Sequence, residues 1–269
     1  MRALAVLAAL LGTLLPIGCG GADFVYFESI TSGPNPGATL IVVWMSDSPA
    51  DDADALEVTV SRVELVGAGG SVLLASDSRT VDLLSLQNGV RVKLAETNVD
   101  PGAYDRVRIT LVETGTLAPR VRTGGAWQPL GFLTPVAHVI EVPYQLQAAP
   151  DATAEIHVDF NVRTPLLDQG GDLRLDPRLD ALDPAVAGTI AGTVRTAHDG
   201  PVRDAVVVAK RQGIEIRSTR TRPDGTFTLT PLEPGNYDLS VESAPVPIAP
   251  RPAVAVNTGD ITTVALREP

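Results

Sequence analysis

The side chains that could do chemistry in this sequence are few and widely separated. Three histidines, His138, His157 and His198, and a single cysteine, Cys19, occur in 269 residues. No histidine stands in an H-E-x-x-H motif or at another metal-ligand spacing, and the sequence contains no G-x-S-x-G motif and no glycine-rich phosphate loop. We interpret His157, which lies in an alternating apolar segment, as a packed or surface residue rather than a ligand. The sequence therefore predicts neither an enzyme nor a bound cofactor.

Two groups of aspartates could supply oxygen ligands to calcium, which takes about six to eight of them. Asp47, Asp51, Asp52 and Asp54 lie together in one acidic loop. The second group recurs almost every four residues and consists of Asp168, Asp172, Asp176, Asp180 and Asp183. Neither group matches the D-x-[DN]-x-[DN]-G loop, and Pro177 argues against a helix that would align the second group. Solvated loops are the simpler interpretation, and the first group is kept as a set of candidate metal ligands.

A sugar-binding site needs an exposed aromatic ring with polar groups nearby. Trp127 lies in a turn-rich segment, TGGAWQP (123–129), and is therefore a candidate ligand-binding residue. Trp44, the other tryptophan, lies in an apolar run and is expected in the core. The sequence thus allows a glycan as a partner, with Trp127 as the residue that would contact it.

Cys19 follows a short apolar run near the start of the sequence. The run at 3–11 has about the length of a signal peptide's apolar region, roughly 7–15 residues, whereas a membrane-spanning helix needs about 20. The segment LLPIGCGG (14–21) places Gly18 directly before Cys19. It resembles the lipobox of bacterial lipoproteins, with Pro16 where that motif usually carries leucine.

The lipobox resemblance implies that a peptidase removes residues 1–18 and that the thiol and new amino group of Cys19 are acylated, palmitate being one such acyl group. Three acyl chains anchor a protein stably in a membrane. Because Gly20 rather than an aspartate follows Cys19, the outer membrane or cell surface is favoured, with the leaflet unknown. The alternative is an ordinary secretory signal peptide with an incidental cysteine.

Charge is unevenly distributed along the chain. Residues 23–185 contain 23 acidic and 11 basic side chains, whereas residues 186–269 contain nine of each. Such acidity argues against nucleic acid and against direct docking on anionic lipid, since both need a basic surface. With Cys19 acylated no thiol remains for a disulfide, so an exported chain must depend on its hydrophobic core.

The pattern of the chain is that of many short strands joined by turns. Residues 39–45 form an apolar run, 56–66 alternate with one slip near Arg62 that indicates a β-bulge, and 67–70 predict a hairpin turn. Further strands are expected at 72–74, 80–84, 90–94, 106–112, 137–142 and 154–162, and residues 161–183 are expected to be irregular. No long helix is predicted. We therefore expect a tether at 19–37 and an acidic antiparallel β-sandwich at 38–185.

Four short motifs in the first domain occur in a recognisable order. They are WMSDSP (44–49), TVDLL with LQNG (80–89), PGAYDRVR (101–108) and HVDF (157–160). In this order they resemble the bacterial lipoprotein family known as domain of unknown function 4382, over about residues 38–180. The resemblance implies an exported β-domain without an assigned activity, and it carries over no catalytic residue.

The last part of the chain, residues 186–269, has a second set of motifs. The order G-x-V, PV-x-A-x-V, T-x-x-DG-x-F and L-x-PG-x-Y resembles the carboxypeptidase regulatory-like domain, a transthyretin-like or prealbumin-like sandwich of seven strands. The resemblance implies a structural module without peptidase activity. We expect Phe227 and Tyr237 to point inward from adjacent strands, and Asp224 and Gly225 to form a tight hairpin turn.

Together these patterns predict an all-β protein of two antiparallel sandwiches in tandem. The predicted function is that of a non-catalytic, membrane-anchored envelope lipoprotein that binds or scaffolds another envelope protein. The alternative is a carbohydrate-binding, or weakly calcium-binding, surface protein. A hydrolase with an unrecognised site would need a cleft that gathers distant carboxylates.

Overall fold

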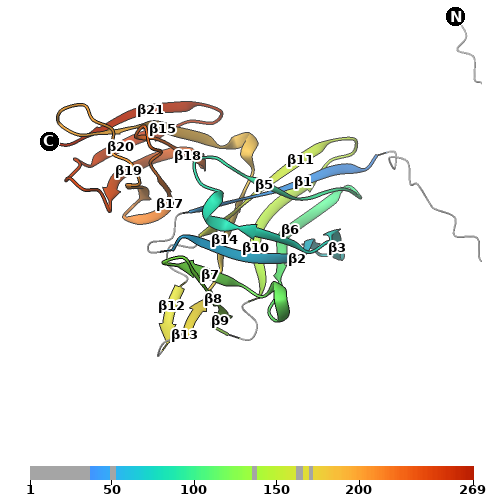
Figure 1. The fold of residues 1–269 in the computed structure, drawn as a ribbon. Helices are drawn as coiled ribbons and strands as arrows, with labels where there is room; N and C mark the ends of the chain where they lie inside the picture. The colour runs from blue at the N-terminus through green and yellow to red at the C-terminus, as the bar shows by residue number, and fades with distance from the viewer. Residues whose placement is uncertain (1–36, 49–52, 135–137, 162–165, 170–171) are drawn as a thin grey trace, which may run out of the picture. The chain divides into compact units, whose positions relative to one another are not determined.

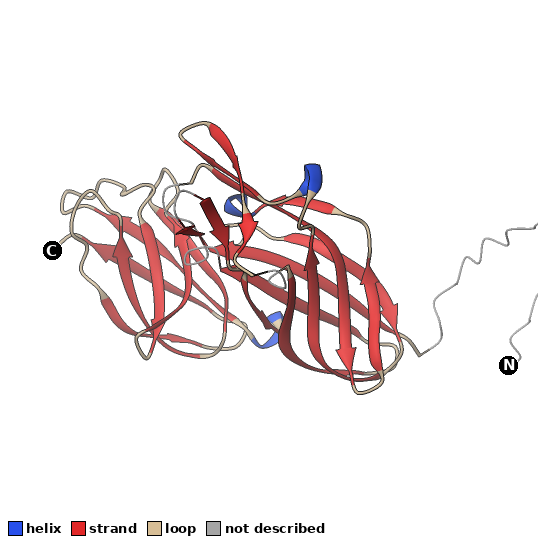
Figure 2. Cartoon of the chain, turned by 90° about the horizontal axis from the view of Figure 1, so that it is seen from below, coloured by secondary structure: helices blue, strands red, loops and turns tan. Residues whose placement is uncertain are grey.

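The computed structural model describes residues 37–48, 53–134, 138–161, 166–169 and 172–269 (Figures 1 and 2). Residues Pro34–Pro269 form one compact unit. Within the described ranges the regular elements are 21 strands and three 3-10 turns, so the all-β prediction is confirmed. No helix in these ranges is both long enough and apolar enough to cross a membrane.

The first sandwich consists of two main sheets. One has the order β14-β11-β1-β5, and the other has the order β10-β6-β2-β7-β8, with β3 and β4 also paired to β2. A small third sheet has the order β12-β13-β9. The elements are β1 (Thr39–Ser48), β2 (Ala55–Gly67), β3 (Gly70–Ala75), β4 (Arg79–Asp82), η1 (Leu83–Ser85), β5 (Val92–Val99), β6 (Gly102–Leu111), η2 (Gly115–Leu117), β7 (Arg120–Thr123), β8 (Ala126–Pro129), β9 (Gly131–Phe132), β10 (Val139–Ala148), β11 (Thr153–Asn161), β12 (Leu166–Gln169), β13 (Asp172–Leu175), β14 (Arg178–Leu182) and η3 (Pro184–Val186).

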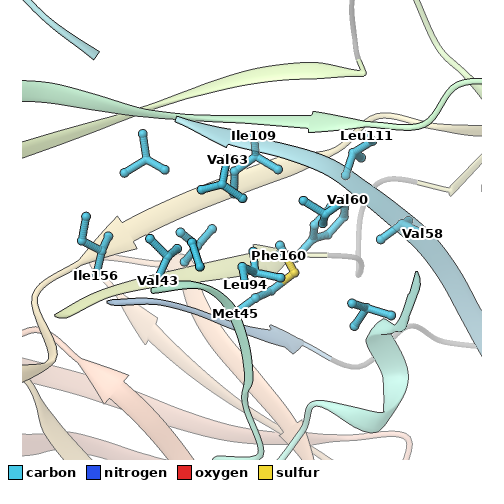
Figure 3. Close-up of a cluster of buried hydrophobic side chains, with 14 of the residues drawn as sticks. Val43, Met45, Val58, Val60, Val63, Leu94, Ile109, Leu111, Ile156 and Phe160 are labelled. Atoms are coloured by element: carbon cyan, nitrogen blue, oxygen red, sulfur yellow. The ribbon is translucent and has the colours of Figure 1, made fainter. Parts of the chain in front are cut away.

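Alternation along the strands decides which side chains enter the core of this sandwich. Successive side chains in a strand point to opposite faces of the sheet. Val43 and Met45 of β1 are therefore buried together with Ile156 and Phe160 of β11, and they meet β2 residues such as Val60 (Figure 3). The residues between them necessarily point to the outer face of the same sheet, which becomes important at the candidate site below.

Strands β1 and β11 pair in parallel, with Val43 opposite Ile156, which is an exception to the antiparallel prediction. The physical reason is that β10 and β11, although consecutive in the chain, belong to different sheets. No hairpin then fixes the direction of β11 relative to its neighbour.

Two local predictions for the first domain are confirmed and one is wrong. The register of β2 against β6 shifts between Val60 and Arg62, where the bulge was expected, and Gly67 pairs with Gly70 at the predicted hairpin. The prediction that 161–183 is irregular is wrong, because β12, β13 and β14 lie there. Strands this short, four to five residues, contain too few alternations to stand out among aspartates and prolines.

The second sandwich has seven strands, as predicted. Its sheets have the orders β18-β15-β21 and β17-β16-β19-β20. The strands are β15 (Gly188–Arg195), β16 (Val206–Arg211), β17 (Ile214–Arg220), β18 (Thr226–Leu232), β19 (Gly235–Glu242), β20 (Arg251–Val256) and β21 (Ile261–Arg267). Strands β15 and β21 pair in parallel, and the other pairs are antiparallel.

Phe227 and Tyr237 are both buried in the core of the second sandwich, as expected. They do not lie on adjacent strands of one sheet, however, because β18 and β19 belong to opposite sheets. Asp224 and Gly225 lie between β17 and β18, which also belong to opposite sheets, so they connect the two sheets rather than a hairpin pair. The Asp224 carboxylate accepts the Thr226 N–H at 2.9 Å. The motif marks a corner of the sandwich.

Candidate functional site

Trp127 is exposed, as the sequence predicted. It lies on β8, a strand at the edge of its sheet, and 39% of its surface is accessible. Its neighbour across the ladder is Arg122, whose guanidinium lies 5.4 Å from the centre of the indole ring. Arg120 lies closer, at 4.3 Å, and also bonds Glu57 at 2.7 Å. The ring is therefore held against two cations, and only part of its surface is open to a ligand.

The acidic loop is only partly described. Asp51 and Asp52 lie outside the described residues, and Asp47 is the last residue but one of β1, with a side chain that is also outside them. The Asp54 carboxylate accepts the Gly125 N–H at 2.9 Å, so it braces the β7–β8 turn. Among the described residues no group of three or more histidine, cysteine or acidic side chains is placed to hold a metal ion. Cys19 lies outside the described residues as well.

Trp44 is not a core residue, which corrects the expectation from the sequence. It lies on the outer face of β1, is half-buried, and carries the Arg91 guanidinium 4.1 Å from its ring centre. Arg91 also lies 3.4 Å from the Glu155 carboxylate. Beside Arg91 is a hollow of about 400 Å³ whose wall includes His157, Thr189 and Asp260. Both sandwiches therefore contribute to this hollow.

A buried polar cluster joins the two sandwiches next to this hollow. Ser46 of β1 and Asp159 of β11 lie opposite each other in the parallel ladder. The Ser46 hydroxyl donates to Asp159 at 2.8 Å and lies 2.8 Å from Nε2 of His157. Arg217, from β17 of the second sandwich, donates to Asp159 and to Ser46 Oγ, the latter at 3.3 Å. All four residues are 3–5% exposed, so the cluster excludes solvent.

The hydrogen bonds of this cluster differ from those of a catalytic triad. In a Ser-His-Asp triad the carboxylate bonds the histidine, and the histidine accepts the serine proton. Here the Ser46 proton goes to Asp159. The contact with Nε2 then requires His157 to donate, since a hydroxyl has one proton to give. His157 therefore cannot serve as the base for Ser46 in this arrangement. Arg217 also donates to both Ser46 Oγ and the Asp159 carboxylate.

Burial and nearby cations set the protonation of the cluster. Burial, with smaller effects of Arg217 and Arg91, lowers the pKa of His157 to about 3. His157 is therefore neutral near pH 7. Burial, followed by the charge of Asp159, raises the pKa of Asp180, which pairs with Asp159 in the ladder. Of the two interpretations left open for His157, a packed or a surface residue, the structure shows the packed one.

The predicted turn at 87–89 forms a second contact between the sandwiches. The Asn88 amide donates to the Arg220 carbonyl at 2.9 Å and accepts the Thr228 N–H at 3.1 Å. Arg220 and Thr228 lie on β17 and β18, which are edge strands of opposite sheets. One side chain thus satisfies backbone groups on the open edges of both sheets, where unpaired groups would otherwise face solvent. The Arg220 N–H also donates to Gln87 at 3.2 Å.

The backbone of the turn suits this docking. Asn88 has a φ of 58°, a left-handed conformation that asparagine tolerates better than most residues. Gly89 has a φ of 80°, and a Cβ at this position would lie 3.1 Å from the Thr230 methyl group. The sequence indicated the turn but not its partner, because the motif looks the same whether it faces water or a second domain.

Comparisons with known proteins agree with the domain organisation. A protein-family model described as "Domain of unknown function (DUF4382)" matches residues 38–177. A second one, described as "Carboxypeptidase regulatory-like domain", matches residues 189–267. No curated protein matches the chain.

Solved structures resemble the chain only remotely. The Bacillus anthracis TIE protein is 11% identical over 85% of this chain, which spans 41% of that protein, with a TM-score of 0.26. The minor pilin GBS52 of Streptococcus agalactiae is 8% identical over 85% of this chain and 96% of its own, with a TM-score of 0.27. The major pilin subunit BcpA of Bacillus cereus is 10% identical over 86% and 71%, with a TM-score of 0.24.

Proposed function

The chain belongs to the family described as Domain of unknown function (DUF4382) and carries a carboxypeptidase regulatory-like domain, and we propose its function from this premise. The proposed function is that of a non-catalytic lipoprotein of the bacterial envelope. In this proposal Cys19 holds the chain on the membrane, residues 19–37 are the tether, and the two sandwiches bind or scaffold another envelope protein.

The junction of the sandwiches is the observation that supports scaffolding. Arg217 and the turn at 87–89 join the two sandwiches by side-chain hydrogen bonds, of which those from Arg217 are buried and those of the turn are partly buried. A module joined in this way presents the surfaces of both sandwiches in a fixed relation. The Ser46–His157 pair, the arrangement nearest to a catalytic one, is instead used in this junction.

The lipid anchor can be tested on the full chain in a bacterial host grown with labelled palmitate. We expect label on the wild-type protein and partition into detergent, and neither with Cys19→Ala. Pro16→Leu is the matched variant, because it restores the usual lipobox residue and is expected to speed processing. A wild-type protein that is cleaved but carries no label would overturn the anchor and favour a secretory signal peptide.

Carbohydrate binding at Trp127 is the second candidate, favoured by the exposed ring on an edge strand. Thermal unfolding of the full chain with a panel of glycans tests it. A glycan at about 100 times its dissociation constant adds roughly 2.7 kcal/mol, which raises the midpoint by roughly 5–10 °C. Trp127→Ala is expected to abolish the shift, and Leu117→Ala, another exposed apolar position, to keep it. The absence of a shift with every glycan would overturn this candidate.

The same experiment can test calcium, because calcium binding by the acidic loop is still only predicted. A shift with millimolar calcium that is lost with Asp51→Asn together with Asp52→Asn would establish weak calcium binding. A wild-type midpoint unchanged by calcium would overturn it.

A further inference from the structure

The outer face of the sheet β14-β11-β1-β5 is polar and yet buried. Because Val43, Met45, Ile156 and Phe160 face the core, the alternate residues of β1 and β11 face away from it. Ser46, His157 and Asp159 are among these outward residues, and each is less than 5% exposed. An outward sheet face with such side chains would ordinarily be solvated, so something other than the first sandwich removes it from water.

Strand β17 of the second sandwich covers this face through Arg217. The guanidinium donates to the Asp159 carboxylate and to Ser46 Oγ, while its Nε has no hydrogen-bond partner among the described residues. A buried charge pair that is incompletely hydrogen-bonded gives little net stability and depends strongly on the charge of its surroundings. The junction is therefore sensitive to any new charge beside Arg217.

His157 is the group placed to introduce that charge. It shares Ser46 Oγ as a hydrogen-bond partner with Arg217, and it borders the hollow that also adjoins Arg91. Its Nε2 proton is already used toward Ser46, so a second proton goes to Nδ1. A protonated His157 then lies beside two arginines in a site with little solvent, where like charges repel strongly.

We propose that the junction of the two sandwiches is an acid-sensitive latch, in which a proton taken up by His157 expels Arg217 and releases the second sandwich from the outer face of β1 and β11. The released face regains water, and His157 becomes an ordinary exposed imidazolium beside Asp159. The proposal concerns the junction alone and holds whether or not the chain is lipidated.

The direction of the pH dependence follows from the burial of His157 and the charges around it. Burial, then Arg217, then Arg91 lower its pKa from 6.5 to about 3 in the docked state. The open state, in which the pKa returns toward 6.5, binds the proton more readily, so acid favours opening. The contact is fully formed above pH 6.5 and weakens by up to about tenfold per pH unit below it, until about pH 3.

The acidic groups that face the cluster act differently. Asp159, on the same strand as His157, pairs with Arg217 and with Ser46. Burial, then the charge of Asp159, raises the pKa of Asp180 on β14; Arg217 lowers it by less, and Glu233 of the second sandwich raises it slightly. Because the docked state protonates Asp180 more readily, this residue favours closure as the pH falls and opposes His157. Removing its charge is expected to steepen the opening.

Hydrogen exchange of the full chain measures the latch directly. The Arg220 and Thr228 N–H groups donate across the junction, to Gln87 and Asn88 respectively, so their protection reports docking. Exchange is followed from pH 7.5 to 5 and divided by the intrinsic rate at each pH. We expect the opening constant of these two amides to rise up to tenfold per pH unit below 6.5. Amides within β16 and β2, in the interiors of the two sandwiches, are expected to stay protected.

Three variants separate the latch from general acid unfolding. His157→Gln keeps a donor toward Ser46 but does not titrate, so its opening constant is expected not to rise as the pH falls; Asp180 alone would lower it slightly. His198→Gln, at an exposed histidine, is the matched control and should behave as wild type. Asp180→Asn should steepen the pH dependence. A wild-type opening constant that is flat between pH 7 and 5, or that rises equally in His157→Gln, would overturn the proposal.

Discussion

The two outer faces of the first sandwich carry the same chemistry in different surroundings. On the face of β6 and β10, Arg106 and Arg108 bond the Glu141 carboxylate at 2.9 and 2.6 Å, and all three are open to solvent. On the face of β1 and β11, Arg217 bonds Asp159 with both side chains about 95% buried. Each face therefore has a guanidinium on a carboxylate, and burial is what differs.

Burial thus distinguishes an ion pair that lies on the surface from one that joins two domains. An exposed pair is screened by water and contributes little to stability. In a buried pair, removing one partner leaves an uncompensated charge in the interior, which is strongly destabilising. The Arg217–Asp159 pair thereby makes the packing of the second sandwich a condition for the buried face of the first.

The largest effect is expected from breaking the buried pair. Arg217→Ala leaves Asp159 buried without its cation, and we expect the free energy of unfolding to fall by about 3–5 kcal/mol. Urea denaturation of the full chain measures this loss. The double variant Arg217→Met with Asp159→Leu removes both charges and is expected to recover most of the stability. A loss below about 1 kcal/mol in Arg217→Ala would mean that the buried pair contributes no more than an exposed pair does, which would contradict this prediction.

A smaller effect is expected at the second contact of the junction. Asn88→Gly removes the amide that bridges β17 and β18 while it tolerates the φ of 58°, and we expect a loss of about 2 kcal/mol from the unpaired backbone groups. Asn88→Ala is the comparison, because it adds the strain of a left-handed alanine, about 1–2 kcal/mol. Thermal unfolding of both variants separates the two causes, and equal stability of the two would exclude backbone strain.

The cores of both sandwiches could be predicted from the sequence, because alternation is a local signal. It located β1, β2 and the bulge at Arg62, and the motifs of the second domain resembled those of a seven-strand sandwich, which the structure has. What failed was the assignment of strands to sheets. Phe227 and Tyr237 follow each other closely in the chain, yet a strand can cross to the opposite sheet without leaving a trace in its own residues.

The junction could not be predicted for a related reason. In HVDF (157–160), the histidine and aspartate occupy alternate positions and point to the outer face, while the valine and phenylalanine enter the core. Whether water or another domain covers an outward face depends on residues far along the chain, such as Arg217. The prediction for Trp44 was wrong in the opposite direction. A large apolar residue beside valines resembles a core residue, but Trp44 lies on the outer face of the sheet, under Arg91.

The smallest effect is expected from Glu141→Gln, which breaks the exposed ion pairs of Glu141 with Arg106 and Arg108 at once. We expect no measurable change in the urea midpoint at pH 7, because water replaces the lost bonds. Chiefly through its bond from Arg108, Glu141 has a lowered pKa, so whatever it contributes is present above pH 4.5 and is lost only below that value. The pH window of Glu141 thus lies below the pH at which His157 begins to act. If Glu141→Gln destabilised the chain as much as Arg217→Ala, burial would not be what distinguishes the two faces.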